Sequence, residues 1–173
     1  MDYENLIPKD PELTLFPDLI MQFFGDKTKV VCVIRDPCSV IASMHEVESK
    51  KGITTEIDII EIAASIFNYY WRIHNSDLFK NGMVHIIRFE NIVKKIEEDF
   101  ARIDQFLGFK ISRDGFGKSK LEFDKSDPTY SSNYGQLIQA SSSLKPQLIP
   151  SGKVSEIRKM FGGYNLRYNL WLG

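Results

Sequence analysis

The chain of 173 residues has the length of a single domain, and its 43% hydrophobic and 26% charged residues are those of an ordinary globular protein. The 22 Lys and Arg residues nearly balance the 23 Asp and Glu residues, so the formal charge of -1 excludes a general attraction to nucleic acid or anionic membranes, and any anion site must be local. No stretch approaches the roughly 20 apolar residues of a membrane span or resembles a signal peptide, so we expect neither membrane anchoring nor secretion.

Two cysteines lie six positions apart. Cys32 is inside an apolar run and Cys38 lies just beyond it, and the two have neither zinc-ligand spacing nor a CxxC arrangement. We therefore interpret both as reduced thiols of a cytoplasmic protein and expect no metal site.

The first part of the chain has the pattern of helix, strand and helix. Apolar residues at helical spacing predict an amphipathic helix from Pro11 to its stop at Gly25. The short β-branched run KVVCVI, residues 29–34, is typical of a strand buried on both faces. Asp36 is a good N-cap and Pro37 suits the first helical position, so the next helix should run over residues 37–49.

The same order is repeated further along. Residues 56–79 have the clearest helical periodicity in the chain and predict the main packing helix. The run MVHIIRF, residues 83–89, predicts a second strand, and Asn91 opens a helix that should end at Gly108. Two strand-to-helix units around a long helix indicate an α/β fold with a parallel sheet flanked by helices.

The last third of the chain is less regular. Residues 111–152 are rich in Ser, Asp, Lys, Gly and Pro and predict a long surface loop. A short helix is expected over residues 154–161, ended by Gly162 and Gly163. We find no internal repeat, so residues 1–173 are expected to form one domain.

Arg35 is the first candidate for a binding residue. It stands at the carboxyl end of a predicted parallel strand, beside the N–H groups of the next helix, which is where α/β proteins bind phosphate groups. Ser43, about two helical turns later, could donate to the same anion, whereas Ser39 could bind the anion or cap the helix. From the residues alone, a salt-bridge role for Arg35 and a packing role for Ser43 remain open.

The sequence KVVCVIRDPCSVIASMHEV, residues 29–47, resembles the 3′-phosphate-binding signature of the sulfotransferases that use the sulfate donor PAPS. That signature is a hydrophobic strand, R-[DN]-P, and a Ser eight residues after the Arg, so Arg35 and Ser43 fall on its two contact positions. FPDLIMQFFGDKTK resembles the helix before that strand, and Trp71 falls where the family's long helix usually has a Trp. HIIRFENIV resembles the family's strand with its Y-E-D-L-like turn, and IDQFLGF resembles its I-x-x-F-L-G helix end.

The resemblance implies a fold related to the P-loop NTPases and transfer of a sulfonyl group from PAPS to a hydroxyl or amine. The acceptor would be a small molecule or a glycan, and residues 111–152 would help to shape its pocket. Lys145 and Lys153 lie where the family often has basic residues that reach the 3′-phosphate of PAPS or PAP, although solvated lysines are an open alternative. YSSNYGQLIQASSS resembles the bacterial S-x-x-Q-V-R-Q-P segment, with Ile138 and Ala140 in place of its Arg and Pro.

One family element is missing from the sequence. Before its 3′-phosphate signature, the family has a strand and a Gly-containing loop with Lys and Ser/Thr that binds the 5′-phosphosulfate, followed by a base that is usually His. Nothing before Lys29 matches that loop, and Gly117-Lys118-Ser119 has Ser112 where a Walker motif needs its first Gly. We therefore expect a domain that is incomplete at its N-terminus, leave the catalytic residues unassigned, and interpret all three histidines as structural: His45, His74 and His85.

Two other functions remain open. The chain could be a non-catalytic nucleotide-binding or assembly module on a sulfotransferase scaffold, which the missing loop favours. A nucleotide or small-molecule kinase ranks last because it needs a Walker loop.

The resemblance also has a consequence for assembly. In this family the strand that feeds the missing loop lies between the two strands predicted here. Without it, the two strands either pair directly or leave a gap that a partner chain covers. Exposed strand edges and uncovered apolar faces favour the partner, so we expect a homodimer.

Overall fold

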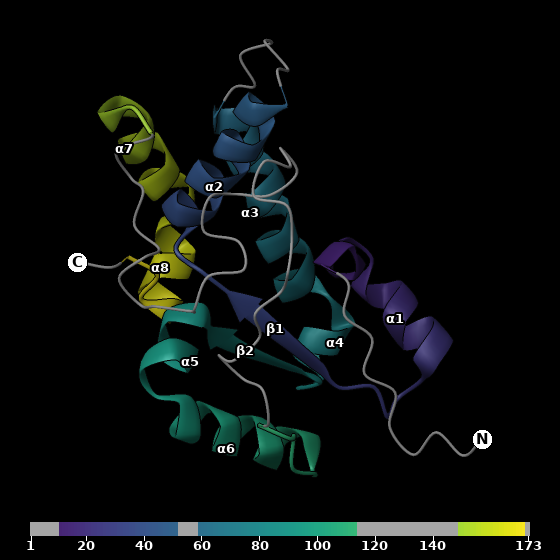
Figure 1. Cartoon of the computed structure of the whole chain (residues 1–173). Coiled ribbons are helices and arrows are strands. Elements are labelled where there is room, and N and C mark those ends of the chain that lie inside the picture. Colours follow the sequence, from purple (N-terminus) through teal and green to yellow (C-terminus); the bar gives the residue numbers. More distant parts are fainter. Residues whose placement is uncertain (1–10, 52–58, 114–148, 172–173) are drawn as a thin grey trace.

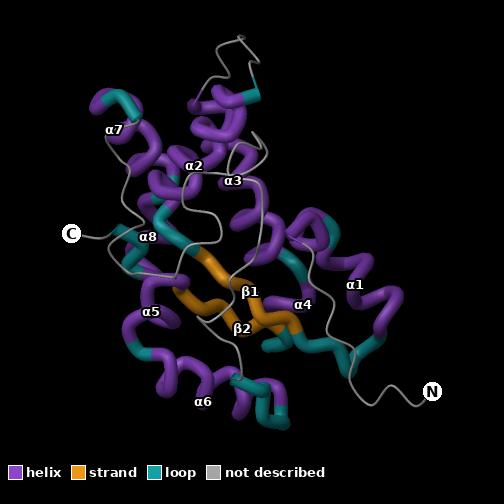
Figure 2. Tube along the Cα trace, viewed as in Figure 1, coloured by secondary structure: helices purple, strands orange, loops and turns teal. Residues whose placement is uncertain are grey.

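The computed structural model describes residues 11–51, 59–113 and 149–171 and has two parallel strands between layers of helices (Figures 1 and 2). Strands β1 (Val30–Ile34) and β2 (Val84–Arg88) pair along their whole length, with Val30 opposite Val84 and Ile34 opposite Arg88. This arrangement confirms the expected α/β fold with a parallel sheet flanked by helices.

Alternating strand residues enter two hydrophobic cores, because successive side chains of a strand point to opposite faces. Cys32, Ile34 and Ile86 pack with α2 (Pro37–Lys50), α3 (Ile59–Asn75), α7 (Ser151–Met160) and α8 (Gly162–Tyr168). Val31 and Ile87 pack on the other face with α5 (Phe89–Lys94) and α6 (Ile96–Leu107). The helices on both faces thereby fix the position of the sheet.

The boundaries around β1 and at the end of α6 agree with the sequence. The Oδ1 atom of Asp36 accepts the backbone N–H of Cys38 at 2.9 Å and so caps α2, which begins at Pro37. Gly108 ends α6 in the left-handed conformation with φ of 86°, which costs a residue without a β-carbon little.

The first predicted helix and the helix predicted from Asn91 are each divided in two. The first is a 3-10 helix, η1 (Pro11–Leu15), followed by α1 (Pro17–Phe24). Pro17 disfavours the helical conformation in the residue before it, so the helix cannot run through Phe16. The helix predicted from Asn91 begins earlier, as α5, and is separated from α6 by Lys95, whose φ of -134° and ψ of 48° are not helical.

Two further boundaries differ from the prediction. The long helix α3 ends at Asn75, and the hydroxyl of Ser76 then accepts the N–H of Phe79 and caps the short α4 (Asp77–Lys80). Helix α7 ends at Met160, just before the glycine pair as expected, but Gly162 begins a further helix, α8, that the sequence did not predict. Most of the predicted surface loop, residues 114–148, lies outside the described residues.

The direct pairing of β1 with β2 corresponds to the first of the two alternatives for the missing strand. Val30 to Ile34 and Val84 to Arg88 are hydrogen-bonded neighbours, so no partner chain is needed between them. A homodimer therefore stays a prediction that needs another contact surface. Among the helices of the described residues, none is long and apolar enough to cross a membrane.

Candidate anion-binding site

Two arginines lie at the carboxyl edge of the sheet. Arg35 follows the last residue of β1, and Arg88 is the last residue of β2, opposite Ile34. The guanidinium carbon of Arg35 lies 4.9 Å from the centre of the Phe89 ring, a cation–π contact that holds the side chain against the start of α5. The parallel register thus brings cationic groups from both strands to one edge.

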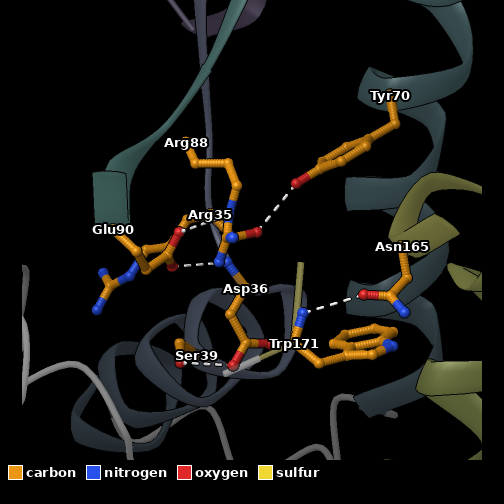
Figure 3. A network of polar contacts seen from close by, with 8 residues as sticks. All are labelled: Arg35, Asp36, Ser39, Tyr70, Arg88, Glu90, Asn165 and Trp171. Carbon is orange, nitrogen blue, oxygen red and sulfur yellow. Dashed lines mark hydrogen bonds and ion pairs between the residues drawn. The ribbon is translucent and has the colours of Figure 1, made fainter. Parts of the chain in front are cut away.

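Glu90 joins the ends of the two strands. Its side chain is only 2% exposed, and its Oε1 atom accepts the backbone N–H of Asp36 at 3.0 Å (Figure 3). Its Oε2 atom lies 3.5 Å from Nε of Arg88, which makes an ion pair without hydrogen-bond geometry. The buried carboxylate therefore fixes the turn that carries Arg35 and compensates the charge of Arg88.

Tyr70 holds the same turn from the other face of the sheet. Its hydroxyl donates to the backbone carbonyl of Arg35 at 3.0 Å (Figure 3). Burial raises the pKa of the Tyr70 hydroxyl, so the group keeps its proton and remains a donor at neutral pH. Helix α3 and the start of α5 therefore restrain Arg35 from two sides.

The electrostatics of the turn keep Arg35 charged. Burial lowers the pKa of Arg35, and the negative charges of Glu90 and Asp36 oppose that effect. Because the ordinary pKa of an arginine lies far above neutral, the guanidinium remains a cation. Burial also raises the pKa of Asp36, while its hydrogen bonds from the backbone of Cys38 and the hydroxyl of Ser39 lower it.

Ser39 is occupied inside the turn. It is buried, and its hydroxyl donates to Oδ2 of Asp36 at 3.3 Å, so Ser39 supports the cap that Asp36 makes and does not itself cap the backbone. Asp36 also accepts backbone N–H groups of the first turn of α2, from Cys38 and Ser39. The Asp36 carboxylate thus accepts helix N–H groups that could otherwise bind an anion. Binding of a phosphate at this turn would therefore depend mainly on side chains.

The other predicted binding residues are Ser43, Lys145 and Lys153. Ser43 is partly buried on α2, and its hydroxyl forms no hydrogen bond with the part of the chain that the structure describes. Lys145 lies outside the described residues. Lys153 on α7 is within 3.4 Å of Glu156, an exposed ion pair within one helix.

Two histidines take part in packing. The Nδ1 atom of His74 lies 2.6 Å from the backbone carbonyl of Tyr70, and Nε2 lies 2.5 Å from the hydroxyl of Tyr168. Because a carbonyl only accepts, Nδ1 carries the proton and Tyr168 donates to Nε2. His85 stacks on Phe106 with the ring centres 5.3 Å apart.

The sequence did not assign roles to Glu90, Arg88 or Tyr70. Glu90 and Arg88 belong to HIIRFENIV, whose similarity to the Y-E-D-L-like turn was noticed without a function for these two residues. The signal that could have found them is the parallel arrangement itself, because the residues that follow two neighbouring parallel strands meet at one edge. The sequence identified Tyr70 only as a packing residue of the helix predicted over residues 56–79.

Comparisons with known proteins show the family and the fold of the chain. A family model described as a sulfotransferase domain matches residues 12–162, and the chain belongs to that family. Its fold is similar to the solved structure of a sulfotransferase domain from the curacin biosynthetic pathway, with a TM-score of 0.58 and 18% sequence identity. That similarity covers 96% of this chain and 63% of the solved chain, so the present chain spans less than two thirds of that relative. A comparison with curated proteins found no match.

Proposed function

We propose that the Arg35 turn binds the 3′-phosphate of PAPS, as part of a cytoplasmic sulfotransferase that transfers a sulfonyl group to a hydroxyl or amine. The acceptor would be a small molecule or a glycan, and the assembly a homodimer. The observation that carries the proposal is that Arg35 stands at the carboxyl end of β1, restrained by Tyr70 and Glu90 in a protein of the sulfotransferase domain family.

The chemistry of the turn suits a phosphate. A guanidinium forms two parallel hydrogen bonds to a phosphate and stays charged at every physiological pH. Its stacking on Phe89 and the hydrogen bonds to the turn reduce the freedom that Arg35 would lose on binding. Ser43, one helix turn beyond Ser39, supplies a hydroxyl with no other partner among the described residues.

Transfer of a sulfonyl group also needs groups that stabilise the charge of the moving group, as in phosphoryl transfer. Neither strand of the described structure is followed by a Gly-containing loop with Lys and Ser/Thr, since β1 runs into Arg-Asp-Pro and β2 into Phe-Glu-Asn. We therefore expect this chain by itself to bind PAP but to turn over little PAPS, because binding one end of the donor lowers the barrier little.

The second candidate is a non-catalytic nucleotide-binding module on the same scaffold. It is favoured because neither strand of the described structure is followed by a Gly-containing loop with Lys and Ser/Thr. An assay with radiolabelled PAPS and a panel of phenols, sugars and amines separates the two functions. Robust turnover would exclude the non-catalytic module and would show that another segment binds the 5′-phosphosulfate.

Calorimetry tests the donor site. PAP should bind more tightly than 5′-AMP, which lacks the 3′-phosphate, and Arg35→Ala should remove the difference. The loss of a charged hydrogen bond to phosphate is about 1.5–3 kcal/mol, or roughly ten- to hundred-fold in affinity. Arg102→Ala, which changes an exposed arginine on α6, is the matched control. Equal affinities of the wild type for PAP and 5′-AMP would contradict the proposal.

A further inference from the structure

One side of α1 carries large apolar side chains that the other described residues leave exposed. Leu19 and Phe23 are four positions apart on α1 and so share one side of the helix, and Phe16 immediately precedes the helix. The exposed fractions of Phe16, Leu19 and Phe23 are 54%, 45% and 77%. Trp71 on α3 is also half exposed, at 49%. We call these four residues the α1 face. In Figure 1, α1 lies at the side of the molecule away from α7 and α8.

The α1 face continues from one helix to the other. Phe16, Leu19 and Trp71 line a single hollow of about 320 Å³, so they form one surface instead of separate exposed side chains. The neighbouring side of α1 packs inward through Pro17 and Ile20, which are buried. The apolar surface of α1 is therefore wider than the part that is buried against the other described residues.

The size of the α1 face fits the centre of a protein interface. Four large apolar side chains with about half of their surface exposed present on the order of 400 Å², because each can bury roughly 150–250 Å². A standard interface buries about 800 Å² on each partner and surrounds an apolar centre with a polar rim. The α1 face supplies such a centre.

The charges beside the α1 face favour a second copy of the same chain. Asp18 and Arg72 line the same hollow, both are exposed, and neither forms an ion pair with any residue in the described ranges. In a two-fold interface, a contact of residue i with residue j of the partner occurs twice. One surface that carries both charges can therefore form two Asp18–Arg72 pairs with its own copy.

We propose that the α1 face is the contact surface of a homodimer, in which two copies pack α1 against α1 about a two-fold axis. Leu19 and Phe23 lie one turn apart on α1, and Phe16 and Trp71 line the same hollow as Leu19. The surface is separate from the strand edges and from the Arg35 turn. The proposal thus stands or falls independently of donor binding.

Sedimentation equilibrium over a concentration series tests the dimer. The wild type should approach twice the chain mass of 19.9 kDa, and Phe23→Asp should weaken dimerisation about ten-fold or more. Leu166→Asp is the matched control, because Leu166 is 90% exposed on α8, outside the α1 face. A monomeric wild type throughout the series, or equal effects of the two variants, would overturn the proposal.

Charge reversal tests the two-fold geometry. Asp18→Arg and Arg72→Asp should each weaken the dimer, because each brings like charges together twice, and the double variant should restore it. A double variant that is no tighter than either single variant overturns the two-fold arrangement. PAP affinity measured on Phe23→Asp should equal that of the wild type, which separates this proposal from the proposed donor site.

Discussion

Replacement of Glu90 tests how much the contacts between the ends of β1 and β2 contribute to the free energy of unfolding. The carboxylate is 2% exposed, accepts the N–H of Asp36 at 3.0 Å, and forms an ion pair with Arg88 at 3.5 Å. Glu90→Ala removes both interactions. Glu90→Gln keeps an acceptor for the N–H of Asp36 but removes the negative charge beside Arg88, so the two variants separate the hydrogen bond from the ion pair.

The expected losses follow from burial. Removing one partner of a buried ion pair costs about 3–5 kcal/mol, because the other charge is left uncompensated. The side chain of Arg88 is only 13% exposed, so water screens it little, and we expect Glu90→Ala to fall in this range. Glu90→Gln also leaves Arg88 uncompensated but keeps the acceptor for the N–H of Asp36, so its loss should be smaller than that of Glu90→Ala by the hydrogen bond, about 1 kcal/mol. The total free energy of unfolding of a domain is about 5–15 kcal/mol, so either loss is measurable.

Urea unfolding followed by circular dichroism measures these free energies of unfolding. Glu61→Ala is the matched control, since Glu61 is an exposed glutamate on α3 and its loss should change stability by less than about 0.5 kcal/mol. The reasoning is refuted if Glu90→Ala costs no more than the control, or if the alanine and glutamine variants are equally destabilised.

Three further predictions concern groups around the sheet. Tyr70→Phe removes the hydrogen bond to the carbonyl of Arg35 and should lower the free energy of unfolding by about 1 kcal/mol and weaken PAP binding. Urea unfolding and calorimetry measure the two effects. No change in either quantity would contradict the role of the hydroxyl. Burial lowers the pKa of His74 below that of the unfolded chain, so its contribution to stability is present above about pH 6.5 and is lost as the pH falls toward the folded-state pKa. His74→Gln should flatten the fall in the unfolding free energy below pH 6.5, and an unchanged slope would assign it to another group. Burial raises the pKa of both Cys32 and Cys38 to about 11, so a thiol reagent at neutral pH should label the native protein much more slowly than the unfolded one. Fast labelling of the native protein would contradict their burial.

Features that depend on neighbours a few positions away could be predicted from the sequence. The apolar run before Arg35 predicts β1, and Asp36 with Pro37 predicts the start of α2, because a cap and a fixed φ act within one helical turn. Gly108 marks the end of α6 for the same local reason. The resemblance in these local patterns was also sufficient to identify the sulfotransferase domain family.

The tertiary structure decided the contacts that join distant parts of the chain. Glu90 and Asp36 are 54 positions apart and Tyr70 and Arg35 are 35 apart, so no local pattern shows that a carboxylate and a hydroxyl hold the same turn. The direct pairing of β1 with β2 likewise joins residues far apart in the chain, such as Val30 and Val84. The exposure of Phe23 was hidden from the sequence too, because helical periodicity identifies apolar positions but not which of them the rest of the chain covers.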